Sequence, residues 1–234
     1  GGKQGTTVEV TVTGGDLEEV NQLYFDHAGI KAELVPEMKD GKPVPIPAAG
    51  PAKFRVTIAP EVPLGLHDVR AIGRFGISNP RTFVVGDMIE VNETEPNNVL
   101  TAATRVLADK VPSITVNGQI NGATDIDYFV FSARAGQRIL MDCYGQRIDS
   151  RLNGRLTLTT ATGKRLAAND DFHDRDPFLD VTISADGDYI VGVTDQVFDG
   201  SPEYSYRLNI GTLPYIDYLL PPAAAPGTTS QFTV

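Results

Sequence analysis

The chain has 234 residues, of which 41% are hydrophobic, so it is long and apolar enough for about two domains with their own cores. Twenty basic and thirty acidic side chains give a net charge of −10, which argues against nucleic-acid and anionic-membrane partners, where clusters of Lys and Arg are expected. The acidic balance suits cation binding and equally suits solubility alone. A single cysteine excludes an internal disulfide, and no apolar run is long enough to insert into a membrane.

Residues 1–88 predict a first β-sandwich. Thr7–Val12 alternates between polar and apolar residues, and Lys53–Ala59 repeats this period of two. Further short strands are expected at 20–25, 30–35, 66–75 and 81–85. The proline-rich stretch Pro36–Pro51, which includes Pro43, Pro45 and Pro47, is expected to be a loop because proline is excluded from central strands.

Residues 86–92 are expected to be a linker, followed by a second sandwich that is jelly-roll-like. Leu100–Ala108 is expected to hold one or two helical turns because alanine and leucine favour helix. After it, strands are expected at 113–120, 127–133, 138–143, 155–160, 179–183, 188–194 and 204–210. Because no long stretch has helical periodicity, the predicted class is all-β, with domains at 1–88, 89–212 and 213–234.

The two ends of the chain resemble each other. Gly5–Val12 reads GTTVEVTV, and Gly227–Val234 reads GTTSQFTV. Such an echo indicates a tandem array in which 213–234 is a linker followed by the first strand of a further repeat. Coincidence between two Thr/Val-rich strands is the alternative.

Two short segments carry the strongest chemical signal. Glu93-Thr-Glu-Pro-Asn-Asn98 places two carboxylates and two carboxamides on a proline-broken stretch, and Asp125 and Asp127 stand at the start of an aromatic strand. Oxygen ligands from two loops are what Ca²⁺ requires. The alternative is that the first segment caps a short helix beginning near Asn98.

A second acidic stretch, Asn169–Pro177, holds four aspartates but fits no EF-hand frame. A solvated, flexible loop is expected, with a different calcium loop or a polar ligand-binding loop left open. Arg147, Arg151 and Arg155 are candidates to pair with these acids and brace the loop.

Nothing in the sequence points to catalysis. The three histidines lie in separate segments without zinc-ligand spacing, and there is no nucleophile elbow or phosphate loop. Cys143 lies in a predicted strand with no histidine near it in sequence, so a buried structural thiol is expected. Tryptophan is absent, which weakens the case for a sugar-stacking platform. Four tyrosines are alternatives for such a platform, although core packing is expected for each: Tyr144, Tyr189, Tyr204 and Tyr206.

Residues 93–212 resemble the bacterial pre-peptidase C-terminal domain. The resemblance covers about half of the chain and rests on segments that occur in the family's order: Glu93–Asn98, Val116–Gly118, Asp125–Phe129, Ala135-Gly136, Thr162-Gly163, Asn169–Asp171, Ala185–Tyr189 and Tyr204–Leu208. Residues 1–88 resemble, more weakly, an immunoglobulin-like domain of the IPT/TIG type through Gly5–Val8, Pro63–Arg70 and Gly76–Asn79. The pair resembles secreted or surface multidomain proteins of environmental bacteria such as planctomycetes.

The resemblance implies a calcium site, because the similar collagen-binding domains of clostridial collagenases ligate calcium through the corresponding segments. Carried over residue by residue, the ligands would be Glu93, Glu95, Asn97, Asn98, Asp125 and Asp127. This chain has Asn98 where the relatives often have aspartate, and Ala123-Thr124 where a Ser/Asp pair would add oxygens. Each missing carboxylate is expected to weaken binding.

The function expected from these features is a non-catalytic, calcium-stabilised structural or adhesion module of a larger secreted or cell-surface protein. Its partners would be neighbouring domains of the same polypeptide, and extracellular polysaccharide or protein. The alternative is a carbohydrate- or protein-binding module that targets an attached hydrolase or peptidase to its substrate.

Overall fold

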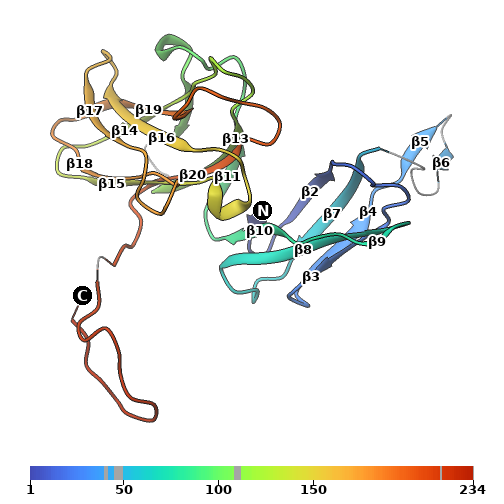
Figure 1. The fold of residues 1–234 in the computed structure, drawn as a ribbon. Helices are drawn as coiled ribbons and strands as arrows, with labels where there is room; N and C mark the ends of the chain where they lie inside the picture. The colour runs from blue at the N-terminus through green and yellow to red at the C-terminus, as the bar shows by residue number, and fades with distance from the viewer. Residues whose placement is uncertain (40–41, 45–49, 108–111, 217, 234) are drawn as a thin grey trace.

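The computed structural model describes residues 1–39, 42–44, 50–107, 112–216 and 218–233 (Figure 1). Two β-sandwiches follow each other along the chain, and an extended segment leaves the second one (Figure 1). The predicted all-β class is therefore confirmed. In the described ranges, no helix has the length and apolarity needed to cross a membrane.

The first sandwich contains one sheet with the strand order β1-β10-β8-β3, with β9 beside β8, and a second sheet with the order β2-β7-β4. The order β10-β8-β3 matches strands G-F-C of immunoglobulin-type domains, and the order β2-β7-β4 matches strands B-E-D. The strands are β1 (Gly2–Lys3), β2 (Thr7–Val12), β3 (Gln22–Phe25), β4 (Ile30–Leu34), β7 (Ala52–Ile58), β8 (Gly65–Gly73), β9 (Gly76–Ile77) and β10 (Arg81–Gly86).

Alternation along the central strand β7 builds the first core. Phe54, Val56 and Ile58 are completely buried, and the intervening residues are exposed. Phe25 and Phe83 meet edge to face across the core with ring centroids 5.2 Å apart. The period-two pattern in the sequence therefore identified the inward face of β7 correctly.

The proline-rich stretch is not entirely a loop. β5 (Glu37–Lys39) and β6 (Lys42–Val44) form an antiparallel hairpin separate from both main sheets. The loop expectation is therefore wrong at these residues, although the exclusion of proline from central strands holds because Pro43 lies in this small outer hairpin. Pro45 and Pro47 lie outside the described residues.

The expected linker at 86–92 is wrong, because most of it is a strand of the second sandwich. β11 (Ile89–Asn92) pairs in parallel with β13 (Ser113–Gln119), and Val91 packs against the second core. Only Asp87 and Met88 separate β11 from β10. The two sandwiches are therefore joined almost strand to strand.

The second sandwich has the strand order of a jelly roll. One sheet runs β11-β13-β20-β15-β18 and the other runs β12-β14-β19-β16-β17. Its remaining elements are η1 (Leu100–Ala102), β12 (Thr104–Leu107), β14 (Asp127–Ala133), β15 (Arg138–Tyr144), η2 (Gln146–Ile148), β16 (Gly154–Thr160), β17 (Arg165–Asn169), β18 (Phe178–Thr182), β19 (Gly187–Asp195) and β20 (Ser205–Gly211). The inward faces of both sheets supply its core, including Phe129, Phe131, Leu156, Val191 and Leu208.

The chain enters and leaves the second sandwich along one row of paired residues. Ile89 pairs with Ile114, and Ile114 pairs with Ile210 near the end of β20. In the first sandwich, Gly2 of β1 similarly pairs with Val85 near the end of β10.

Three details of the second domain differ from expectation or extend it. The helical turns expected at 100–108 reduce to the 3₁₀ turn η1, because Thr104 and Arg105 already pair with β14; Ala108 lies outside the described residues. Strand β17 was not predicted, although Thr162-Gly163, the turn that leads into it, is among the segments that carry the family resemblance. Gly163 has φ +83°, a left-handed conformation that suits glycine.

The C-terminal segment, residues 213–233 without 217, forms no named strand and contains the isolated bridge between Leu220 and Thr233. Its resemblance to β2 and the tandem array that this resemblance implies stay predictions.

Candidate functional site

Three carboxyl groups from two distant segments meet at the end of β11. Glu93 and Glu95 directly follow this strand, and Asp127 is the first residue of β14. One oxygen from each of the three side chains lies within 4.8 Å of the others. Asp127 is completely buried, Glu93 is half-buried and Glu95 is exposed. We call these three residues the acidic cluster.

The acidic cluster is tied together by a buried tyrosine of β20. The Tyr206 hydroxyl lies 2.5 Å from Asp127 Oδ2 and 3.1 Å from Glu93 Oε2. Because a hydroxyl carries one proton, both contacts are hydrogen bonds at once only when one of the carboxyl groups is protonated. In the absence of a cation, the favoured state of the Tyr206 hydroxyl and the Asp127 and Glu93 carboxyl groups therefore has two protons among the three groups.

Electrostatics agree with this geometry. Burial, reinforced by the neighbouring Glu93 carboxylate, raises the pKa of Asp127 to about 9, although the Tyr206 hydrogen bond opposes the shift. Burial also raises the pKa of Glu93, against the hydrogen bonds from Asp127, Tyr206 and the Gln119 amide. Carboxyl groups that lie close together and away from water resist ionisation, because each negative charge repels the next. A bound cation would offset this repulsion.

Buried polar atoms beside the cluster lack partners. Asn97 is completely buried, and neither its Oδ1 nor its Nδ2 has a hydrogen-bond partner among the described residues; the same holds for Asp127 Oδ1. An unsatisfied buried polar atom costs about 1 to 3 kcal/mol, so such atoms call for a specific explanation. The Asn97 main chain is bonded: its N–H donates to Glu95 Oε2 at 2.9 Å and its carbonyl accepts from the Tyr128 N–H.

The other two predicted ligands form a separate pair. The Asn98 carboxamide donates to Asp125 Oδ1 at 2.8 Å, and the Asn121 N–H donates to Asp125 Oδ2 at 2.6 Å. Both Asp125 oxygens are thus engaged in holding the loop that leads into β14. The structure brings the carboxylates of Glu93, Glu95 and Asp127 into one group that does not include Asp125. Asn97 and Asn98 lie beside it, because the Asn97 N–H is shared between Glu95 Oε2 at 2.9 Å and Asn98 Oδ1 at 3.2 Å.

The helix-capping alternative is wrong. The residue preceding η1 is Val99, it makes no side-chain capping hydrogen bond, and the first turn of η1 carries no acidic residue. The Asn98 side chain instead points its amide at Asp125. The acidic stretch therefore has no role in satisfying the N-terminus of this short helix.

Sequence reasoning missed two contributors to the site. Core packing was expected for Tyr206, but that expectation does not say which groups its hydroxyl contacts. Gly118 lies opposite Tyr206 across the β13–β20 pair, and the absence of a side chain there leaves room for the ring and for Glu93. A glycine within a strand is the signal that would have indicated such a close approach.

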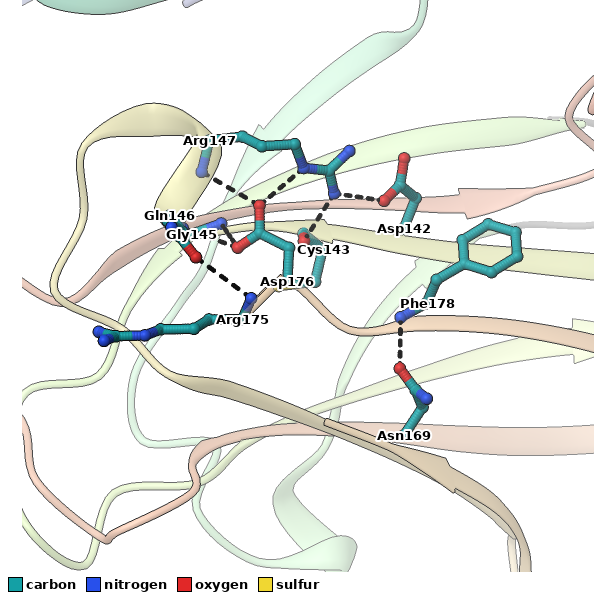
Figure 2. Close-up of polar contacts among 9 residues, drawn as sticks. All are labelled: Asp142, Cys143, Gly145, Gln146, Arg147, Asn169, Arg175, Asp176 and Phe178. Atoms are coloured by element: carbon teal, nitrogen blue, oxygen red, sulfur yellow. Dashed lines mark hydrogen bonds and ion pairs between the residues drawn. The ribbon is translucent and has the colours of Figure 1, made fainter. Parts of the chain in front are cut away.

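The second acidic stretch is anchored at Asp176, whereas residues 171–175 are exposed, as expected of a solvated loop. Figure 2 shows the Asp176 carboxylate accepting hydrogen bonds from the N–H groups of Gly145, Gln146 and Arg147 and from Arg147 Nε. Asp176 is completely buried. The expected bracing is confirmed for Arg147 with Asp176 and for Arg155 with Asp170, whereas Arg151 pairs with Glu203 instead.

Cys143 is completely buried, as predicted for a structural thiol. Burial raises the pKa of its thiol, and the nearby carboxylates Asp176 and Asp142 add to the shift, so the reactive thiolate is disfavoured. Of the four tyrosines considered as stacking groups, Tyr189 and Tyr206 are buried core residues, whereas Tyr144 and Tyr204 are half-buried.

Comparisons with known proteins give one sequence relative and weak structural likenesses. No family model matches the chain. The chain is 31% identical over 110 residues to a probable subtilase-type serine protease of Deinococcus radiodurans; the match covers 46% of this chain and 15% of that protein. The chain therefore spans a small part of its relative's length.

Among solved structures, the pre-peptidase C-terminal domain of a Bacillus anthracis collagenase is 12% identical with a TM-score of 0.33, covering 47% of this chain and 92% of that one. A secreted serine protease of Vibrio cholerae is 11% identical with a TM-score of 0.31, covering 89% of this chain and 47% of that one. At these scores the likenesses say nothing of function.

Proposed function

We propose that this chain is a non-catalytic, extracytoplasmic accessory module of a larger secreted protein, and that a calcium ion bound at the acidic cluster stabilises it. The observation that carries the proposal is the meeting of Glu93, Glu95 and Asp127 beside the unpartnered, buried Asn97.

The residues present suit a hard cation. Three carboxylates and a carboxamide oxygen are the donors that Ca²⁺ prefers, and it takes six to eight of them. Glu93, Glu95, Asp127 and Asn97 would hold the ion, which would supply positive charge to carboxylates that burial now keeps from ionising. Its binding would therefore release protons. Asn98 and Asp125 would act by holding the loop that carries Asp127.

The site's position suggests what the ion would do. Glu93 and Glu95 follow directly on β11, the first strand of the second sandwich, and Asp127 begins β14 in the opposite sheet. An ion held by both would fasten the two sheets of the jelly roll to each other. It would lie at the end of β11 away from the connection at Asp87 and Met88, so it would stabilise the second sandwich itself.

The accessory role is supported by the sequence relative. A match over 110 residues that takes up 15% of a probable subtilase-type protease suits a module that accompanies a catalytic domain. The secreted location follows from the resemblance of the chain to secreted multidomain proteins.

Thermal unfolding in EDTA and in millimolar calcium tests the proposal. Calcium at tenfold excess over its dissociation constant should stabilise the chain by about 1.4 kcal/mol, which raises the melting temperature by about 3 to 6 °C. Asp127→Asn and Glu95→Ala should each abolish this gain. Asp16→Asn removes an exposed carboxylate whose φ of +55° asparagine tolerates, so it should respond as wild type does. An unchanged response in Asp127→Asn would refute the site.

A further inference from the structure

The two sandwiches enclose a cleft at their junction. One cavity of about 420 Å³ lies between the outer face of the β15–β20 sheet and the β8–β10 end of the first sandwich. A second cavity of about 550 Å³ extends it towards Pro112–Ser113. Both are lined by the same five residues, Leu64, Asp87, Met88, Tyr144 and Asn209, so the two cavities adjoin, and we call them together the interdomain cleft.

The floor of the cleft is polar and held in place. The carboxamide of Asn209 accepts a hydrogen bond of 2.7 Å from the buried Thr115 hydroxyl. The Arg147 guanidinium lies 3.6 Å above the Tyr144 ring and is fixed by Asp176 on one side and Asp142 on the other (Figure 2). Asp142 and Asn209 themselves line the cleft. Few, well-positioned polar groups of this kind are typical of ligand sites.

The opposite wall is apolar and comes from the other domain. Leu64 and Leu66 flank the first residue of β8 and remain 53% and 51% exposed, although they stand at a domain junction. Half-exposed leucines facing an aromatic ring across a cleft leave apolar surface for a ligand to cover.

The charges that line the cleft are largely cancelled. Arg147 is paired with Asp142 and Asp176, and Arg207 makes a two-pronged ion pair with Glu90. Lys3 and Asp87, which also line the second cavity, are of opposite sign. Because the whole chain carries −10, an anionic ligand would be repelled at long range. A neutral ligand suits this balance best.

We propose that the interdomain cleft binds a neutral polysaccharide. Carboxylate and carboxamide groups such as Asp142 and Asn209 match the paired hydroxyls of sugar rings. Leu64, Leu66 and the half-buried Tyr144, one face of which Arg147 already covers, would contact the rings' C–H groups. Two adjoining cavities of about 420 and 550 Å³ leave room for more than one sugar unit, which suits a polymer rather than a single sugar. The inference rests on the accessory-module role and gives that role a ligand. None of the cleft residues belongs to the acidic cluster, so the two proposals fail separately.

Affinity electrophoresis of the whole chain tests this assignment, with and without calcium. The gels would contain β-glucan, xylan, mannan or galactan as neutral probes, polygalacturonate as an anionic probe and gelatin as a protein probe. At least one neutral polymer should retard the wild-type chain. Tyr144→Ala and Leu66→Ala, one from each wall, should each weaken retardation at least tenfold.

Tyr24→Ala is the matched control, because it removes a 54% exposed tyrosine from β3 outside the cleft and should bind as wild type does. Leu66→Ala changes a half-exposed side chain, so it keeps the test valid if Tyr144→Ala fails to fold. The assignment would be overturned if no neutral polymer retarded the wild-type chain, or if only polygalacturonate or gelatin did. It would also be overturned if both cleft variants were retarded as strongly as the wild-type chain. Loss of the calcium response with retained retardation would instead refute only the calcium site.

Discussion

Gly118 shows how tightly the acidic cluster is built at the level of single atoms. A Cβ added there would lie 2.3 Å from the Tyr206 ring and hydroxyl and 2.5 Å from Glu93 Oε2. We expect Gly118→Ala to displace Tyr206 and to cost about 1 to 3 kcal/mol of stability through overpacking. The calcium-dependent gain in melting temperature should shrink with it.

Urea unfolding with and without calcium would measure both effects. Gly122→Ala serves as the control, since a Cβ at Gly122 meets no atom within 4 Å. A Gly118→Ala chain with wild-type stability would show that Tyr206 is free to move, contrary to the packing seen here.

The ion pair of Glu90 with Arg207 gives a prediction in pH. Both side chains are largely buried, and Arg207 Nη1 and Nη2 each lie 2.7 Å from a Glu90 oxygen. Burial by itself would raise the pKa of Glu90, but Arg207 and Asn117 outweigh it and lower the pKa below 4.5. A lowered carboxyl pKa contributes stability above the unfolded value of 4.5, and this contribution is lost as the pH falls through the folded value.

Glu90→Gln should therefore destabilise the chain by about 3 kcal/mol at pH 7, because it leaves Arg207 buried without its counter-charge. The difference between variant and wild type should narrow below about pH 4.5 as Glu90 itself becomes protonated. Unfolding free energies from pH 7 to pH 3 measure this difference, and a constant gap would contradict the assigned pairing.

At the residue scale, the sequence indicated which acids would gather but not how each is used. Glu93, Glu95 and Asp127 were singled out because carboxylates from two loops can together supply the oxygen ligands of a calcium ion. Asp125 looked equivalent to Asp127, and only the fold shows that the Asn98 side chain and the Asn121 main chain occupy it. A side chain's hydrogen-bond partners depend on three-dimensional neighbours that a period of two does not encode.

At the scale of elements, η2 of the second sandwich carries a residue at its end that contacts the first sandwich. Asp149 follows this short helix with φ +62°, and its Oδ2 accepts hydrogen bonds from the Thr82 N–H at 2.8 Å and the Thr82 hydroxyl at 3.0 Å. Thr82 belongs to β10 of the first sandwich. This contact and the two-residue connection between β10 and β11 both link the first sandwich to the second.

Asp149→Gly suits the left-handed backbone and removes both hydrogen bonds, so it should loosen the joint without unfolding either sandwich. Spin labels at the exposed positions Phe75 and Val197 would report this as a broader distance distribution. Asp149→Asn keeps an acceptor and tolerates the same φ, so its distribution should stay narrow. Equal widths in all three chains would mean that other contacts fix the joint.

At the element scale, strands with clear alternation were predicted closely, and those without it were missed. β7 and β14 follow their alternating patterns, and each has neighbours on both sides. β11 and β17 are four and five residues long and lie at sheet edges, where one face is not fully buried and the pattern weakens. β11 also needs a parallel partner that begins 24 positions later along the chain, at Ser113, which no local pattern reveals.

For the molecule as a whole, the sequence predicted two consecutive sandwiches but not how they contact each other at their junction. The cleft depends on Leu64 and Leu66 facing Tyr144, which neither domain specifies alone. Tyr144 was recognised as a possible stacking residue, and its placement on the outward face of β15 is what sets it apart from the buried Tyr189 and Tyr206.

The pairing of Ile89 with Ile114 and of Ile114 with Ile210 has a mechanical consequence. The points where the polypeptide enters and leaves the jelly roll are two strand spacings apart, roughly 10 Å. Gly2 likewise lies beside Val85, and Lys3 and Thr212 line the same cleft. In each sandwich the strands by which the chain enters and leaves therefore lie close together. A force applied along the polypeptide would load these terminal strands and the junction between the sandwiches first, and the remaining strands of each sandwich would bear little of it.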